Sequence, residues 1–152
     1  MKKRFLFLLF SIFALGSLKA QLPDGSQAPD WILTDLNGNT HHLQEYLDAG
    51  KTVYIDMFAT WCGPCWNYHQ THTLKNLYEQ YGPDGTDQVM VFGIESDIST
   101  PTNCLYDQNC PSSQGDWTAG VPYPIIDITA TNGPNMPNNY ALSYYPTIYG
   151  IC

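Results

Sequence analysis

The sequence predicts an α/β domain whose mixed central sheet is flanked by helices. The first observation is a strand–helix–strand unit over residues 52–94, in which two apolar, β-rich runs, Thr52–Phe58 and Gln88–Ile94, enclose a long segment with helical spacing. Two strands joined in this way are expected to lie parallel, with a right-handed crossover. The second observation is that shorter strand-like runs precede and follow the unit and can extend the sheet.

The elements before this unit are predicted to form a hairpin. Residues 31–36 read as a strand that enters a tight turn at residues 37–38, because Asn-Gly is typical of two-residue hairpin loops. Residues 41–48 follow as a return strand and one helical turn, which the Ala-Gly pair at 49–50 ends.

A single helix is predicted over residues 62–81, because its apolar and aromatic side chains recur three or four positions apart. Residues 96–120 are polar and turn-rich, with a short helix capped at Thr100-Pro101. The remaining elements are expected to be an edge strand within residues 122–128, a loop over 130–139, a brief helix over 139–144 and a last strand over 146–151.

A cysteine pair stands where the buried strand meets the helix, since residues 61–65 read Trp-Cys-Gly-Pro-Cys. Only a thiolate attacks a disulfide, and the unpaired N–H groups at a helix N-terminus favour the anion at Cys62. Two intervening residues let Cys65 resolve a mixed disulfide at Cys62, and Pro64 is tolerated in a first helical turn. The pattern therefore indicates a redox-active dithiol.

Other uses of the same spacing stay open, namely a structural disulfide or half of a zinc site. Haem attachment needs a histidine directly after the second cysteine, and Trp66 excludes it. His69 and His72 lie near the same helix side as Cys65, but we expect them to be ordinary polar positions. We therefore expect no metal and no cofactor besides the redox-active disulfide.

Residues 1–20 show the pattern of a secretory signal peptide, with a basic start, an apolar stretch and a cleavage point after Ala20. The apolar stretch is shorter than the roughly 20 residues of a membrane span, although an uncleaved anchor is the alternative. We expect residues 21–152 to form one exported domain, periplasmic or extracellular, with no stable membrane insertion.

The expected mature chain is strongly acidic. It keeps two basic residues, Lys51 and Lys75, and all fourteen acidic residues of the sequence. Such a surface has no means of neutralising phosphates, so nucleic acid is not an expected partner.

Export places the five cysteines in an oxidising compartment. Cys104 and Cys110 are expected to form a structural disulfide worth about 2 kcal/mol, with two free thiols as the alternative. Cys152 is left without a predicted partner. A reducing dithiol in such a compartment also needs an electron donor.

The sequence resembles the thioredoxin superfamily, and more narrowly its exported TlpA/ResA-like branch of thiol–disulfide oxidoreductases. The resemblance extends over about residues 25–151. It is carried by the entry segment at 25–31, the active site at 58–65, the end of the second strand at 93–96, the central insertion at 121–127 and the cis-proline loop at 145–147.

This resemblance implies a thioredoxin-like fold and roles for named residues. Cys62 would attack a disulfide and Cys65 would resolve it, while a buried Asp56 would help to deprotonate Cys65. Glu95 would tune thiol acidity or substrate choice. The alternatives are that Asp56 only hydrogen-bonds at a strand edge and that Glu95 is a solvated acid.

A substrate groove is expected between the dithiol and the cis-proline loop, where backbone can pair with an extended substrate. The residues expected to form it are Trp61, Gly63, Pro64, Tyr145 and Pro146.

Two departures from the family pattern carry further expectations. Trp66 stands where thioredoxins usually have a basic residue, which predicts a more apolar surface near the dithiol. The chain stops six residues after Pro146, whereas the fold normally adds an edge strand and a final helix. We therefore expect a C-terminally incomplete domain from a longer secreted protein.

The predicted function is reduction of disulfide-containing proteins through Cys62 and Cys65, since Gly-Pro between the cysteines resembles reducing members. An extracytoplasmic electron donor, which the sequence does not identify, would reduce the Cys62–Cys65 disulfide back to the dithiol after each reaction. One alternative is a non-catalytic binding or maturation module with a structural Cys62–Cys65 disulfide. Another is a peroxiredoxin-like peroxidase, which would frame one cysteine with a proline and a threonine three residues apart; only Thr60 is present.

Overall fold

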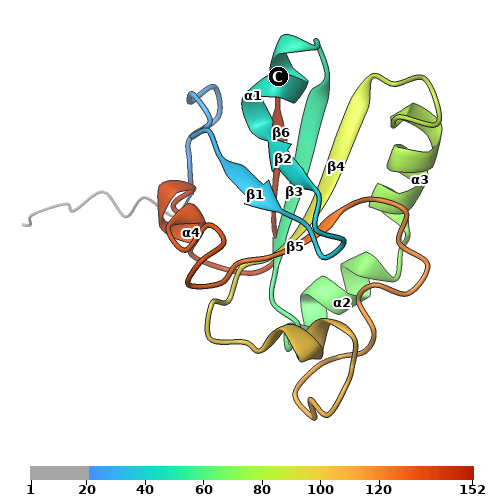
Figure 1. Cartoon of the computed structure of the whole chain (residues 1–152), viewed down its shortest axis with the longest axis vertical. Coiled ribbons are helices and arrows are strands. Elements are labelled where there is room, and N and C mark those ends of the chain that lie inside the picture. The colour runs from blue at the N-terminus through green and yellow to red at the C-terminus, as the bar shows by residue number, and fades with distance from the viewer. Residues whose placement is uncertain (1–20) are drawn as a thin grey trace, which may run out of the picture.

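The computed structural model describes residues 21–152, so the predicted signal peptide over residues 1–20 lies outside the described part. Its centre is a four-stranded sheet with the order β5-β4-β3-β6 (Figure 1). The pairs β3–β4 and β4–β5 are parallel and β3–β6 is antiparallel, which confirms the predicted mixed sheet. The strands are β3 (Thr52–Phe58), β4 (Val89–Glu95), β5 (Ile125–Asp127) and β6 (Thr147–Ile151).

Strand β3 is the centre of this arrangement because it is hydrogen-bonded on both sides. Asp56 lies opposite Gly93 on β4 and opposite Ile148 on β6. Since side chains alternate along a strand, Asp56 and Phe58 share one face of the sheet and Met57 points to the other. Each of these three β3 side chains is buried.

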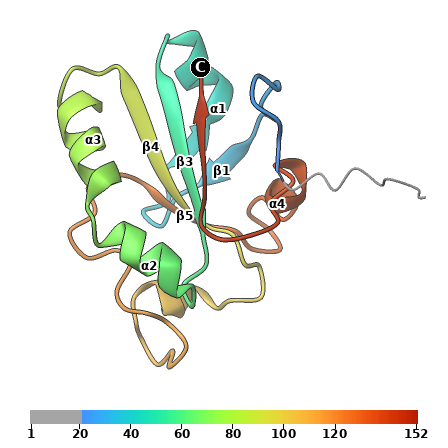
Figure 2. The ribbon, with the colours of Figure 1, turned by 180° about the vertical axis from the view of Figure 1, so that it is seen from behind.

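The N-terminal elements cover one face of the sheet (Figures 1 and 2). Strands β1 (Ile32–Thr34) and β2 (Thr40–His42) pair antiparallel, as the hairpin prediction requires, and α1 (Leu43–Asp48) follows directly. Gly38 in the connecting turn has a φ of 86°, which glycine adopts without steric cost. The apolar side chains of this layer pack with Val53, Ile55 and Met57 into the main core.

The opposite face is covered by α2 (Gly63–His69) and α3 (Thr73–Tyr81). Leu74 of α3 packs there with Val89 and Val91 of β4. These two helices replace the single helix predicted over residues 62–81, and that prediction was wrong.

The helix breaks because the backbone tightens around Thr71 and His72. The N–H groups of these two residues donate to carbonyls only three positions back, at Tyr68 and His69. The Thr71 hydroxyl also donates to the Tyr68 carbonyl, at 2.7 Å, and so competes with the helical ladder. His72 then adopts a left-handed conformation with a φ of 58°, from which α3 starts in a new direction.

The C-terminal half contains short elements joined by long loops. A 3-10 helix, η1 (Thr102–Leu105), follows β4 and begins after Pro101, near the predicted cap. Helix α4 (Met136–Asn139) lies inside the segment expected to be a loop, and the helix expected over 139–144 is absent, so both predictions were wrong. The buried Met136 side chain, which packs into the main core, anchors this earlier turn.

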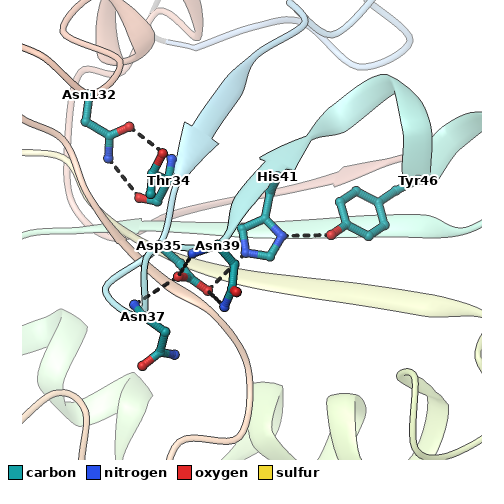
Figure 3. A network of polar contacts seen from close by, with 7 residues as sticks. All are labelled: Thr34, Asp35, Asn37, Asn39, His41, Tyr46 and Asn132. Carbon is teal, nitrogen blue, oxygen red and sulfur yellow. Dashed lines mark hydrogen bonds and ion pairs between the residues drawn. The ribbon is translucent and has the colours of Figure 1, made fainter.

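A buried polar network attaches the hairpin to the core (Figure 3). The His41 ring lies between the Asp35 carboxylate, at 3.0 Å, and the Tyr46 hydroxyl, at 2.8 Å. Burial acts to raise the pKa of Asp35, but hydrogen bonds from His41 and Asn39 outweigh it and lower the pKa. His41 also contacts the edge of the Phe92 ring, so the polar network joins the apolar core directly.

Asn132 provides a second attachment between the hairpin and the sheet (Figure 3). Its side chain accepts a hydrogen bond from the Thr34 N–H at 3.0 Å and donates to the Thr34 carbonyl at 2.9 Å. The same amide nitrogen donates to the Asp127 carbonyl at 2.9 Å. One side chain thus connects β1 to the end of β5.

We expect Asn132→Ala to lower the free energy of unfolding by about 2 kcal/mol, because it removes three hydrogen bonds of about 1 kcal/mol each and some are replaced by water. Urea unfolding measures this. Asn135→Ala is the matched control, since the Asn135 side chain makes no capping hydrogen bond to α4. Equal stability of the two variants would contradict the role of Asn132.

Candidate functional site

The two cysteines of the Trp-Cys-Gly-Pro-Cys segment form a disulfide at the start of α2. Cys62 is the N-cap residue of this helix, and its Sγ accepts a hydrogen bond from the Cys65 N–H at 3.2 Å. Pro64 occupies the first turn, where its missing N–H leaves no helical bond unmade. The helix N-terminus is therefore directed at Cys62, which favours negative charge on its sulfur after reduction.

Cys62 and Cys65 differ in what surrounds them. Both residues are buried and belong to the same apolar cluster as Phe58 and Leu105, but Cys62 also lines an open groove and Cys65 does not. Of the two cysteines, Cys62 is therefore the one that borders the space open to an approaching molecule.

The groove beside Cys62 is apolar and aromatic. Its walls come from the dithiol segment and, far from it in sequence, from α4 and the chain between α4 and β6. Four of the five residues predicted to bind substrate lie there: Trp61, Gly63, Pro64 and Tyr145. Pro137, Leu142 and Tyr144 also line the groove, and sequence reasoning missed them.

Trp61 and Tyr145 line this groove from its two walls. Their rings meet edge to face, with centroids 5.7 Å apart. The Trp61 indole N–H donates to Asp97 at 2.8 Å, which fixes the orientation of a side chain that is 46% exposed. The Tyr145–Pro146 peptide bond is cis, as in the resemblance, although Pro146 itself is not among the groove-lining residues.

Asp56 lies on the sheet face covered by α2 and α3. Its side chain is buried, and one of its carboxyl oxygens has no hydrogen-bond partner within residues 21–152. This burial raises the pKa of Asp56 to about 7. The carboxyl borders a small cavity together with Tyr68 and Tyr123.

Glu95 ends β4 beneath the loop that leads to the dithiol. One carboxyl oxygen accepts a weak hydrogen bond from the Thr60 N–H at 3.4 Å, and the other accepts from the Asp97 N–H at 3.1 Å. Burial, and then the nearby Asp127 carboxylate, raise the pKa of Glu95 to about 8. Glu95 is thus a buried acid, and the alternative of a solvated strand end was wrong.

Asp127 is a further buried acid at this site that sequence reasoning did not single out. It is the residue opposite Glu95 in the β4–β5 pairing. The only signal in the sequence was an acid at the end of a short apolar strand, and the pairing register needed to place it beside Glu95 cannot be read from the sequence.

Cys104 and Cys110 form a second disulfide, between η1 and the loop after it. Cys152 is exposed and is the one free cysteine in the part of the chain that the structure describes.

The histidines of the helical segment do not join the cysteines in a cluster. The His69 ring stacks on Trp66 and also contacts Trp117, and burial lowers its pKa. His72 is exposed at the break between the helices. Within residues 21–152 no group of three or more histidine, cysteine or acidic residues could hold a metal ion.

Trp66 packs against the apolar cluster that contains Phe58 and Trp117, and it does not line the groove. The apolar character of the groove therefore comes from other residues.

One protein family matches most of the chain. The redoxin family matches residues 23–126, which is more than half of the chain. The chain belongs to the redoxin family. Its fold is the thioredoxin-like fold that the sequence resemblance implied.

This redoxin is similar to curated bacterial proteins named thiol-disulfide oxidoreductase ResA. It is 37% identical to that of Geobacillus kaustophilus over 73 residues, which covers 48% of this chain and 40% of the relative. It is 33% identical to that of Bacillus subtilis over 111 residues, which covers 64% of this chain and 60% of the relative. The chain thus spans about half of the length of these relatives.

Solved structures share the fold of this redoxin. The thioredoxin domain of a thiol-disulfide oxidoreductase from Bacteroides vulgatus superposes with a TM-score of 0.57 at 17% identity, covering 85% of this chain and 81% of that chain. A thiol-disulfide oxidoreductase from Bacteroides fragilis gives 0.57 at 16% identity, covering 82% of each chain. At these identities the likeness concerns the fold alone.

Asp56→Asn is expected to flatten the dependence of stability on pH. A carboxyl with a raised pKa in the folded state stabilises the fold fully below its unfolded pKa of about 4, and that contribution is lost as the pH rises through about 7. Through Asp56, the free energy of unfolding should fall by about 4 kcal/mol between roughly pH 4 and pH 8, and the variant should lack this part.

Urea unfolding across that range measures the difference between the two slopes. Asp84→Asn, at an exposed acid, removes the same charge and should keep the slope of the unmodified protein. Identical slopes for Asp56→Asn and the unmodified protein would mean that Asp56 does not hold a proton near neutral pH.

Proposed function

We propose that this redoxin is a thiol–disulfide oxidoreductase that reduces disulfides in other proteins. The observation that carries the proposal is the position of the cysteine pair: Cys62 borders an open groove at a helix N-terminus, and its disulfide partner Cys65 does not line that groove. A groove of this kind admits an extended chain, and the helix N-terminus favours the thiolate that attacks. The relatives named thiol-disulfide oxidoreductase ResA support the same chemistry.

The reaction begins with the reduced dithiol and a substrate disulfide. The Cys62 thiolate attacks one substrate sulfur, a bond forms between the two sulfurs, and the other substrate sulfur leaves as a thiolate. Cys65 then loses its proton and attacks Cys62, which closes the Cys62–Cys65 disulfide and releases the second substrate thiolate. The substrate gains two electrons and the protein loses two.

Asp56 is proposed to take the proton of Cys65. A carboxyl with a pKa of about 7 can accept and return a proton near neutral pH, unlike an ordinary aspartate that stays ionised. Its position on the face that α2 covers supports this role. Glu95 is proposed to set the charge beneath the dithiol loop, because it accepts the Thr60 N–H two residues before Cys62.

Trp61 and Tyr145 are proposed to hold the substrate chain against Cys62, together with Gly63 and Pro64. Both rings line the groove and each keeps apolar surface open to it. The Tyr145 backbone next to Pro146 is the proposed pairing partner for an extended substrate.

The direction of electron flow and the compartment are further parts of the proposal. We infer that the protein works outside the cytoplasm, after removal of residues 1–20, and that an extracytoplasmic donor reduces its disulfide. The apolar stretch after a basic start supports export. Within residues 21–152, no helix has the length and apolar character of a membrane span.

Insulin reduction, followed as turbidity in the presence of dithiothreitol, tests the function. Cys62→Ser should reduce the rate at least about a hundredfold, because it removes the attacking sulfur. Cys152→Ser is the matched control: it changes an exposed thiol outside the site and should keep the full rate. A Cys62→Ser rate equal to that of the control would support a structural disulfide in a non-catalytic module instead.

Cys65→Ser should trap the reaction at its intermediate, because the mixed disulfide at Cys62 then has no internal thiol to resolve it. Non-reducing gels with a disulfide-bonded test protein would show a covalent adduct that dithiothreitol removes. An adduct formed equally by Cys62→Ser would contradict the assignment of the two sulfurs.

A further inference from the structure

The acids at the ends of β4 and β5 form a pair that the proposed reaction leaves unexplained. Glu95 and Asp127 are direct partners in the parallel pairing of these strands. Partner residues on adjacent parallel strands point to the same face, with backbones about 5 Å apart. Both side chains are buried, at 1% and 5% exposure.

The hydrogen bonds of the two carboxyls are unequal. Asp127 receives the Thr102 hydroxyl on one oxygen, while its other oxygen has no partner within residues 21–152. Glu95 receives two backbone N–H groups, one of them at the weak distance of 3.4 Å. A free buried oxygen beside a second carboxyl is the arrangement in which two acids hold one proton between them.

Within residues 21–152, no ion pair joins either carboxyl to a basic side chain. Asp127, Asp97 and the Tyr145 hydroxyl interact electrostatically with Glu95, and none of these three groups is basic. The two lysines of the described chain lie elsewhere and pair with surface acids, Lys51 with Asp87 and Lys75 with Glu79. Burial raises the pKa of Asp127 as well, against the hydrogen bond from Thr102.

We propose that Glu95 and Asp127 act as one coupled carboxyl pair that carries a single proton around neutral pH, with Asp127 as the positioning residue that keeps Glu95 neutral. Thr102 stabilises the anion on Asp127, so the proton resides mainly on Glu95. The negative charge is thereby held on the side of the pair away from the Thr60 loop.

This arrangement matters for the dithiol if the proposed function holds. An ionised Glu95 under the loop would oppose formation of the Cys62 thiolate, whereas a neutral Glu95 would not. Thr102 belongs to η1, the same short helix whose Cys104 is fixed by the second disulfide. The structural disulfide thus holds in place the hydroxyl that determines where the proton lies.

Carbon-13 NMR of glutamate carboxyl groups tests the pair directly. The chain has three glutamates, and Glu45 and Glu79 are exposed and serve as internal references. In the disulfide form Glu95 should titrate well above these two. In Asp127→Asn its midpoint should fall by about one pH unit or more, because a neighbouring negative charge is removed.

Two further variants keep the test decisive. Thr102→Val changes an exposed residue and should broaden the Glu95 curve toward lower pH, because Asp127 without its donor competes for the proton. Asp107→Asn removes one charge from an exposed position five residues after Thr102 and should leave the Glu95 curve unchanged.

A Glu95 midpoint that is the same in Asp127→Asn and in the unmodified protein would overturn the proposal, as would equal shifts in Asp127→Asn and Asp107→Asn. If Asp127→Asn does not fold, an unchanged curve in Thr102→Val overturns it. The titration uses the oxidised protein without substrate, so its result is independent of whether the protein reduces insulin.

Discussion

The site depends on the pairing of β3 with a neighbour on each side. Its hydrogen bonds to β4 and β6 hold seven buried or half-buried residues in register, and the chain leaves the sheet at Phe58 toward Cys62. The same pairing aligns Phe58 with Glu95, and through β4 with Asp127. The dithiol, its helix and the buried acids therefore occupy one end and one face of a single sheet.

The shortage of basic residues gives this site its electrostatic character. Buried carboxylates are usually compensated by a cation, but the described chain has only two lysines, and both are paired at the surface. The buried acids Asp56, Glu95 and Asp127 therefore respond to burial with raised pKa values. An acidic protein can in this way keep groups near its dithiol that exchange protons around neutral pH.

The sequence predicted correctly those elements whose structure is determined by residues close together in the chain. The central strand was predicted at its observed bounds because a run of seven mostly apolar, β-prone residues stands between clear turn signals, and the hairpin followed from Asn37-Gly38. The break after His69 was not predictable, because no glycine or proline marks it and the competing bond is made by the Thr71 hydroxyl. Helix α4 was misplaced because its position depends on burial of Met136 in a distant core.

The site residues divide in the same way, into those that neighbouring sequence predicts and those that only the fold brings together. Cys62 and the residues around it could be predicted from a contiguous motif. The groove walls at Pro137 and Leu142 and the pairing of Glu95 with Asp127 come from strand order and loop path, which a single sequence does not encode locally.

The central claim is that the end of β3 delivers Cys62, and not Cys65, to a helix N-terminus as the reactive thiolate. Alkylation of the reduced protein with iodoacetamide across pH, with peptide mass mapping of the modified cysteine, tests it most directly. The account predicts that Cys62 reacts first, with an apparent pKa below the ordinary thiol value of about 8.5, while Cys65 stays protected. Equal reaction of both cysteines with an ordinary pKa, or earlier reaction of Cys65, would contradict it.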